Sequence, residues 1–348
     1  MRIKGFLKKD SKMTQKILVT GGAGFLGSHL TDHLLDMGHD VVIMDDLSGG
    51  YVENIDKRAT FFKADISNKK KCDEVMKGID LIYHLAAHAA EGQSVFCPIH
   101  NASTNYMGSL NLAVAAINNG VKRFVFTSSM ARYGKQEELP MHEGQDAIPE
   151  DPYGITKKSF EEILDMFKRV YGMDYVVLVP HNIFGPRQNM ADPYRNVVGI
   201  FINRILQGKP PMVYGDGLQK RAFTYIDDCI PYIAKAGFIK EALGKIMNIG
   251  PDEEPITVKE VAQKVIKVMN FDGEEIHMPP RPLEVKYAYC SADKARKILG
   301  YKTSHTFDEG LKKYIEWAKI KGSQKFKYWD EFEIKSDKIP RAWSEKLL

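Results

Sequence analysis

The chain has 348 residues, of which 44% are hydrophobic, enough to bury the core of a globular protein larger than one average domain. Its 49 basic and 45 acidic residues give a formal net charge of +4, which is too balanced to indicate a nucleic-acid partner. No apolar run is long enough to span a bilayer, so no membrane partner is expected either.

Four cysteines lie far apart, with neither the pairing expected of a disulfide framework nor the spacing of metal ligands. They are Cys72, Cys97, Cys229 and Cys290. We therefore expect no disulfide, no metal site and a reducing compartment. The basic segment Met1–Lys12 lacks an apolar stretch long enough for a signal peptide, which also favours a cytoplasmic protein.

Short β-branched runs alternate with longer segments of helical periodicity over the first half of the chain. Six runs are predicted to be buried parallel strands: Ile17–Thr20, Val41–Met44, Thr60–Phe62, Leu81–His84, Phe124–Thr127 and Tyr175–Val179. This alternation predicts an α/β fold with a Rossmann-type, doubly wound parallel sheet.

After Asn182 the chain becomes richer in proline and glycine, and strand and helix patterns return near Ile246–Asn248 and Val258–Met269. We therefore expect a smaller C-terminal lobe threaded between late elements of the sheet. The predicted ranges are 14–182 and about 222–256 for the Rossmann domain, 183–221 and about 257–317 for the smaller lobe, and 318–348 for a C-terminal extension.

The extension is polar, with scattered aromatic residues. These include Tyr328, Trp329, Phe332 and Trp343. We expect an ordered tail packed on the body of the protein, with a flexible tail as the alternative.

The segment from Thr20 to Gly27 follows the first strand and opens a helix, with Gly21, Gly24 and Gly27 in a G-x-x-G-x-x-G frame. Such a turn lets the backbone approach a pyrophosphate while the helix N-terminus supplies N–H donors and a positive dipole. The glycines alone are equally compatible with a turn that binds nothing.

Asp45, followed by Asp46, ends the second predicted strand. A carboxylate there accepts hydrogen bonds from the adenosine ribose and repels the extra phosphate of NADP, so the pattern favours NAD. A solvated turn is the alternative. Residues after the next two strands are expected to flank the adenine and ribose, or to be ordinary strand ends: Asp65, Ile66, Leu85, Ala86 and Ala87.

Tyr153 and Lys157 are four residues apart, so on a helix they share one face. Ser129 follows the fifth strand, at the carboxyl edge where ligands bind in such sheets. A neighbouring ammonium and a positive nicotinamide would both favour the phenolate, so Tyr153 is a candidate base, with Ser129 hydrogen-bonded to the reacting hydroxyl. A surface helical pair is the alternative for Tyr153 and Lys157.

From about Lys16 to Tyr301 the sequence resembles the extended short-chain dehydrogenase/reductase family, especially NAD-dependent nucleotide-sugar epimerases and dehydratases such as UDP-glucose 4-epimerase. The markers are the segments 20–27, 84–87, 128–134, 153–157, 181–188, 213–217 and 221–228, together with Asn105, Arg281 and Pro282. The resemblance implies NAD as the cofactor, with further contacts from Phe25, Leu26, Asn105, Ser128, Tyr153, Lys157, Pro180 and His181.

The resemblance also implies a nucleotide-diphosphate sugar as the substrate. Asn182, Arg221 and Arg281 are expected to contact it, both arginines near the diphosphate, where guanidinium groups bind phosphate oxygens bidentately. Tyr214 and Val198 are expected to line the base pocket, or to be plain core residues. Three other cations are interpreted as solvated charges: Arg187, Arg195 and Lys220.

Related dehydratases carry an acid–base pair where this chain has Met130 and Ala131, neither of which can transfer a proton. We therefore expect inversion at C4 through a transient 4-keto sugar rather than 4,6-dehydration. A 4-dehydrogenase that releases the keto sugar and NADH needs the same residues and stays open as an alternative.

A non-catalytic NAD-binding scaffold is the alternative from another class, because a fold alone does not imply activity. The complete set of Ser129, Tyr153 and Lys157 argues against it. The resemblance further implies a homodimer built by the helices carrying Asn105–Asn119 and Tyr153–Tyr171.

Overall fold

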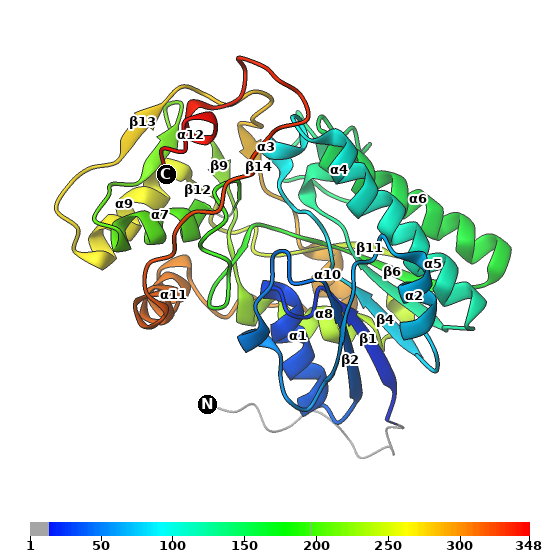
Figure 1. Cartoon of the computed structure of the whole chain (residues 1–348). Coiled ribbons are helices and arrows are strands. Elements are labelled where there is room, and N and C mark those ends of the chain that lie inside the picture. Colours follow the sequence, from blue (N-terminus) through cyan, green and yellow to red (C-terminus); the bar gives the residue numbers. More distant parts are fainter. Residues whose placement is uncertain (1–13, 196) are drawn as a thin grey trace.

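The computed structural model describes residues 14–195 and 197–348, so the segment Met1–Lys12 lies outside the described residues (Figure 1). Its centre is a parallel sheet with the strand order β11-β6-β5-β4-β1-β2-β3. The strands are β1 (Lys16–Thr20), β2 (Asp40–Asp45), β3 (Thr60–Lys63), β4 (Leu81–His84), β5 (Arg123–Thr127), β6 (Asp174–Pro180) and β11 (Ile246–Ile249). The six strands predicted in the first half are confirmed, and so is the late return of the chain near Ile246.

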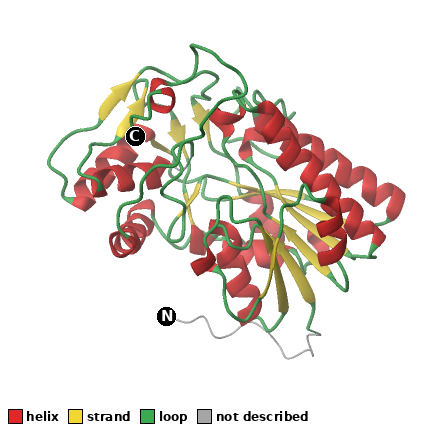
Figure 2. Ribbon diagram, viewed as in Figure 1, coloured by secondary structure: helices red, strands yellow, loops and turns green. Residues whose placement is uncertain are grey.

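Helices cover both faces of this sheet, as Figure 2 shows. Side chains of β1 alternate, with Ile17 and Val19 in one apolar cluster and Leu18 in the other, so the middle of the strand is apolar on both faces. Helices α1 (Phe25–Asp36) and α8 (Ile230–Ala236) pack together on one face. The other face carries α2 (Lys69–Val75), α5 (Gly108–Asn118) and α6 (Pro152–Tyr171).

The strand order reverses between β1 and β4, because the chain returns from β3 to the other side of β1. In open α/β sheets, ligands bind at the carboxyl ends of the strands at such a switch point. The connection after β4 contains α3 (Glu91–Ser94) and α4 (Pro98–Ala102), and a π-helical turn at Ser103–Met107 joins α4 to α5. Short 3-10 turns lie at Val52–Asn54, Met130–Tyr133, Ile226–Asp228 and Lys240–Ala242.

The smaller lobe is built on α7 (Val197–Leu206), α9 (Val258–Met269) and α11 (Phe307–Lys321), which pack against one another. Its short strands are β8 (Met212–Tyr214) with β13 (Ile276–Met278), and β9 (Lys220–Arg221) between β12 (Ile256–Thr257) and β14 (Tyr287–Ala288). In a further pair of strands, β7 (Ile183–Phe184) lies where the chain leaves the large sheet, and β10 (Thr224–Tyr225) lies where it returns to it.

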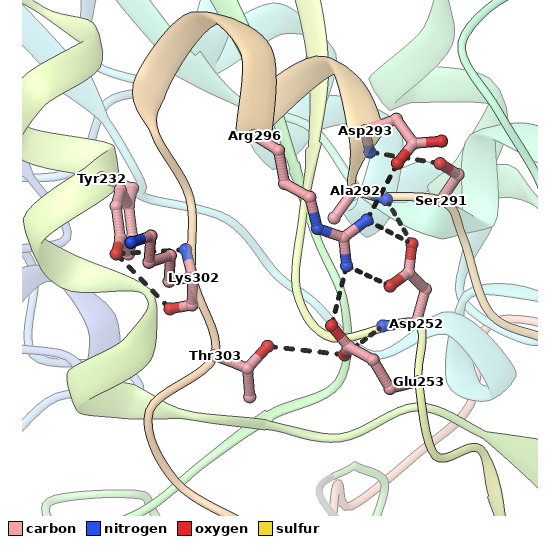
Figure 3. A network of polar contacts seen from close by, with 9 residues as sticks. All are labelled: Tyr232, Asp252, Glu253, Ser291, Ala292, Asp293, Arg296, Lys302 and Thr303. Atoms are coloured by element: carbon pink, nitrogen blue, oxygen red, sulfur yellow. Dashed lines mark hydrogen bonds and ion pairs between the residues drawn. The ribbon is translucent and has the colours of Figure 1, made fainter.

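A polar network fixes the connection that leaves the sheet after β11 (Figure 3). Arg296, on α10 (Asp293–Leu299), donates to both carboxylate oxygens of Asp252 and also pairs with Glu253 and Asp293. The N–H of Ala292 donates to Asp252 at 2.9 Å. The carboxylate therefore joins the end of the sheet to the start of α10.

The C-terminal segment is ordered and packs on the body, as expected. It runs from α11 past α3 to α12 (Arg341–Ser344), drawn in red in Figure 1. Phe326, Trp343 and Leu348 are buried in an apolar cluster. The predicted boundary at residue 318 falls inside α11, because the apolar face of this helix continues to Ala318 and the helix ends only before Gly322.

Candidate functional site

The glycine-rich turn between β1 and α1 leaves no room for side chains. Gly21 has a φ of +71°, in the left-handed region that favours glycine. A Cβ on Gly27 would lie 2.1 Å from the carbonyl oxygen of Gly21, so the helix approaches the turn closely only because Gly27 lacks one, and a Cβ on Gly21 would lie 2.8 Å from the backbone nitrogen of Ala86. The turn therefore has the geometry of a pyrophosphate cradle at a helix N-terminus.

Asp45, the last residue of β2, also holds this turn. Its carboxylate accepts hydrogen bonds from the N–H groups of Ala23 at 3.0 Å and Leu47 at 2.8 Å. Burial raises the pKa of Asp45, and these two hydrogen bonds act in the opposite direction. The residue therefore has a positioning role as well as a place in the cavity wall.

A cavity of about 570 Å³ opens above these elements. Sixteen of the predicted cofactor residues line it: Gly21, Gly24, Phe25, Leu26, Gly27, Asp45, Asp46, Asp65, Ile66, Leu85, Ala86, Ala87, Ser128, Tyr153, Lys157 and Pro180. The glycine cradle, the acidic residue at the end of β2 and the size of the cavity fit an NAD molecule.

Asn105 and His181, two other predicted cofactor residues, lie behind the cavity wall. The Asn105 amide is buried; it accepts from the N–H of His88 at 2.8 Å and donates to the His88 carbonyl at 3.0 Å, so it holds the loop after β4. His181 is fully buried, and burial lowers its pKa to about 4. The family resemblance implies a cofactor contact for both residues, but neither side chain lines the cavity.

The candidate catalytic groups converge at the ends of β5 and α6. Asp151 caps α6 by accepting from the N–H of Gly154 at 2.9 Å, and Pro152 occupies the first helical turn, so the helix begins just before Tyr153. The Nζ of Lys157 lies 5.8 Å from the centre of the Tyr153 ring and donates to the carbonyl of Thr127 at 2.9 Å. Ser129 hydrogen-bonds to Tyr153.

Burial dominates the titration of both groups on α6. It raises the pKa of Tyr153 to about 12, although the hydrogen bond from Ser129 acts to lower it. It also lowers the pKa of Lys157 to about 7, against the negative charge of Glu161. The neighbouring ammonium is thus weaker support for a phenolate than the sequence suggested, because desolvation disfavours both charged forms.

A buried ion pair lies next to the candidate catalytic residues on α6. The guanidinium of Arg132 contacts both oxygens of the Glu161 carboxylate at 2.9 and 3.0 Å, and Ser128 donates its hydroxyl proton to the same carboxylate. Glu161 lies one turn after Lys157 on α6. The pair therefore fixes the helix against the end of β5.

A second cavity, of about 330 Å³, meets the first at Ser129 and Tyr153, which line both. The predicted substrate residues Asn182, Tyr214, Arg221 and Arg281 line it as well. Val198 does not: it is buried in the core, while Val197, Ile200 and Phe201 border the cavity. The prediction that Val198 lines the pocket is therefore wrong. Successive residues of a helix are rotated by about 100°, so Val198 lies on the core side of the helix while Val197, Ile200 and Phe201 border the cavity.

The two arginines of this cavity converge on Glu284. Arg281 donates to the Glu284 carboxylate at 2.8 Å and lies 5.0 Å from the centre of the Tyr214 ring. Arg221 is 3.9 Å from the same carboxylate and donates to the carbonyl of Val285 at 2.7 Å. Sequence reasoning missed Glu284, which offsets part of the positive charge of the two arginines.

Two more carboxyl groups, Glu91 and Asp151, line the same cavity and were also missed. Burial and repulsion from Glu91 raise the pKa of Asp151 to about 7. The Asp151–Pro152 pair is a recognisable helix start and could have indicated Asp151. No local signal marks Glu91, because only the folded chain brings the loop after β4 to the cavity.

Other residues that line the cavities were given a different role in the sequence analysis, or no role in the site. Arg195, interpreted as a solvated charge, borders both cavities and pairs with Asp192 at 2.9 Å. The C-terminal segment lines the first cavity with Lys327, Tyr328 and Trp329, and the second with Pro340, Trp343 and Leu348.

A Rossmann-type sheet with a glycine cradle, an acidic residue after β2 and a Ser–Tyr–Lys set defines an extended short-chain dehydrogenase/reductase. The model of the "NAD dependent epimerase/dehydratase family" matches residues 17–250. The chain belongs to this family, whose members depend on NAD.

Several relatives cover most of the chain. A UDP-glucose 4-epimerase from Mycolicibacterium smegmatis is 33% identical over 320 residues, or 88% of this chain and 99% of that protein. The crystal structure of UDP-glucose 4-epimerase with UDP-glucose from Thermotoga maritima has 36% identity and a TM-score of 0.82, covering 87% of this chain and 98% of that one. The Thermus thermophilus UDP-glucose 4-epimerase in complex with NAD has 32% identity, a TM-score of 0.82 and the same coverage.

No helix in the described ranges, 14–195 and 197–348, combines the length and apolar character needed to cross a membrane.

Proposed function

We propose that this protein inverts the configuration at C4 of a nucleotide-diphosphate sugar, most directly a UDP-hexose, through a transient 4-keto sugar. The observation that carries the proposal is the junction of the two cavities at Ser129 and Tyr153. One cavity has the glycine cradle for NAD, and the other has Arg221 and Arg281 for a diphosphate. Relatives described as UDP-glucose 4-epimerases support the same reaction.

Each candidate catalytic residue has a distinct task in this reaction. Tyr153 takes the proton of the C4 hydroxyl and later returns it, and Ser129 orients that hydroxyl by hydrogen bonding. Lys157, fixed to the carbonyl of Thr127, places a positive charge near the phenolic oxygen when it is protonated. The glycine-rich turn at residues 21–27 and Asp45 would hold NAD in the first cavity, where the cofactor would supply the acceptor and donor of the C4 hydride. Atoms and electrons balance without another reactant.

A second candidate, 4,6-dehydration, is favoured by one observation. Met130 and Ala131 cannot transfer protons, but Glu91 and Asp151 place two carboxyl groups in the same cavity as Tyr153. Elimination of water needs an acid and a base near C5 and C6 of the sugar. We rank this reaction below epimerisation because neither carboxyl group occupies the position after Ser129.

Proton NMR of UDP-sugars incubated with the NAD-loaded protein tests the proposal. Reversible inversion at C4, with no stoichiometric NADH, is the expected result. Tyr153→Phe should lower kcat by about 10²–10⁴-fold while leaving NAD affinity unchanged, because only the phenolic oxygen is lost. A released 4-keto product with NADH would identify a 4-dehydrogenase, a 4-keto-6-deoxy product a dehydratase, and bound NAD without turnover a scaffold.

We further propose the assignments that depend on this function. The large sheet and its helices bind NAD, and the smaller lobe binds the sugar nucleotide. The protein acts in carbohydrate biosynthesis in the cytoplasm, where its four buried free cysteines would stay reduced. It forms a homodimer through the helices around Asn105–Asn119 and Tyr153–Tyr171, where Met107 and Ile155 are about half exposed. Light scattering on the protein as it elutes from a size-exclusion column measures its oligomeric state.

A further inference from the structure

Glu91 is the first residue of α3, in the connection that follows β4. It lines the second cavity, called the substrate cavity from here on, together with Ser129, Asn182 and Arg281. Its carboxylate makes no hydrogen bond and no ion pair with any residue of the ranges 14–195 and 197–348. An ionised carboxylate can only accept hydrogen bonds, so this group lacks a donor that a ligand could provide.

The position of α3 places this carboxylate between the two chemically distinct ends of the cavity. At the arginine end, a Cβ built on Gly92 would lie 3.7 Å from Nη1 of Arg281. At the catalytic end, the Ser94 hydroxyl lies 3.3 Å from the Asp151 carboxylate and accepts from the N–H of Tyr153 at 3.2 Å. The helix therefore borders the space where a hexose lies if its C4 faces Tyr153 and its diphosphate faces the arginines.

The charges around Glu91 are only partly compensated. Burial raises its pKa, and the positive charges of Arg221 and Arg281 act in the opposite direction. Arg281 is already paired with Glu284, and Asp151 adds a second acidic group beside Glu91. Two carboxyl groups, Glu91 and Asp151, thus lie in the middle of the cavity, whereas its arginine end is suited to phosphate.

We infer that Glu91 selects the sugar: it accepts hydrogen bonds from a hydroxyl or ammonium group of a neutral hexose or amino hexose, and it excludes a uronic acid. The inference rests on the proposed function and specifies the substrate class of the same site. A sugar carboxylate here would meet the ionised Glu91 carboxylate, while both arginines would be engaged by the diphosphate. A repulsive group of this kind separates substrates that share the same nucleotide.

Calorimetry on the full-length, NAD-loaded protein tests this inference with UDP-glucose and UDP-glucuronate. The wild type should bind UDP-glucose at least about tenfold more tightly than UDP-glucuronate. Glu91→Gln keeps the shape of the side chain but removes its charge, so it should reduce this preference by about tenfold. UDP alone should bind equally to both proteins, which also shows that the variant is folded. Glu316→Gln, an exposed position on α11, is the matched control and should change neither affinity.

Equal affinities of the wild type for the two sugar nucleotides would overturn the inference, as would an unchanged ratio in Glu91→Gln. The proposed function fails by a different observation. If UDP-glucose binds with the expected preference but its C4 is never inverted, epimerisation is wrong and the role of Glu91 in sugar selection stands. If C4 is inverted with equal efficiency in both sugars, epimerisation stands and the role of Glu91 in sugar selection is wrong.

Discussion

Asp45 combines two roles in one carboxylate. Its oxygens are hydrogen-bonded to the N–H groups of Ala23 and Leu47, and the residue also faces the proposed NAD cavity. Each carboxylate oxygen has two lone pairs, so it can still accept from a ribose hydroxyl. The same negative charge would repel the additional phosphate of NADP.

Asp45→Ala should therefore weaken NAD binding and narrow the preference for NAD over NADP. Part of the lost affinity comes from the turn, because the N–H groups of Ala23 and Leu47 lose their acceptor. Titration of both cofactors against both proteins measures the two ratios. Equal affinities of the wild type for NAD and NADP would refute the assignment of Asp45.

Asp151 should make stability depend on pH. Burial and Glu91 raise its pKa from 3.8 to about 7, so the folded state holds the proton more tightly than the unfolded state. The resulting stabilisation is complete below about pH 4 and is lost as the pH rises through about 7. Asp151→Asn keeps a capping oxygen without the charge.

Urea denaturation at pH 5 and pH 7.5 measures this effect. Between these values, the free energy of unfolding of the wild type should fall relative to that of Asp151→Asn by more than about 1 kcal/mol. Parallel pH profiles for the two proteins would show that Asp151 titrates normally.

At the scale of elements, β11 and α10 depend on a single carboxylate. Asp252 accepts from Arg296 and from the N–H of Ala292 (Figure 3). Burial acts to raise the pKa of Asp252, but these hydrogen bonds outweigh it and the pKa is lowered. The contribution of the network is therefore present at neutral pH and lost as the pH falls through the lowered pKa.

Arg296→Ala should lower the free energy of unfolding at pH 7 by about 1 kcal/mol, because several partners lose one guanidinium. Lys264→Ala is the matched control: it removes an isolated surface pair with Asp308 and should cost less than about 0.5 kcal/mol. Chemical denaturation of the three proteins gives the comparison. If both variants lost the same free energy of unfolding, the Arg296 network would stabilise the protein no more than an ordinary surface ion pair.

At the scale of the whole molecule, the C-terminal segment connects the two lobes. The Glu333 carboxylate accepts from the N–H groups of Ile99 and His100 at 2.8 Å, on helix α4, which packs against α6. In the smaller lobe, the carbonyl of Leu347 accepts from Arg204 at 3.0 Å. The segment lies beyond the region matched by the family model, yet it forms part of both cavity walls.

Trp343 is the main apolar anchor of this segment. It is 2% exposed, and its ring packs edge-on against Tyr194 at 5.2 Å between ring centres. Trp343→Ala should lower the free energy of unfolding by about 3 kcal/mol and raise the KM for the sugar nucleotide, because it removes both core and cavity wall. Thermal unfolding and steady-state kinetics measure these effects. Unchanged values would show that the segment is a peripheral addition.

The fold could be predicted from the sequence because its signals are local. Buried strands of a doubly wound sheet are continuous apolar runs, so the strands from Ile17 to Val179 were recognisable in order. The glycine turn, Asp45 and the Tyr153–Lys157 pair follow the same logic, because turn chemistry and helical spacing depend on neighbouring residues. The structure brings these residues to one cavity system.

Only the tertiary structure decided which side chains face the cavities. Val198 differs from its neighbours by a helical rotation, and Asn105 and His181 are turned into the interior by packing, which no short pattern encodes. Glu91 lies on the short helix α3 and Trp343 on a distant C-terminal helix, and only folding brings them to the second cavity. The sequence by itself determined the strands and the motifs, since these depend on local geometry, whereas the walls of the site depend on long-range packing.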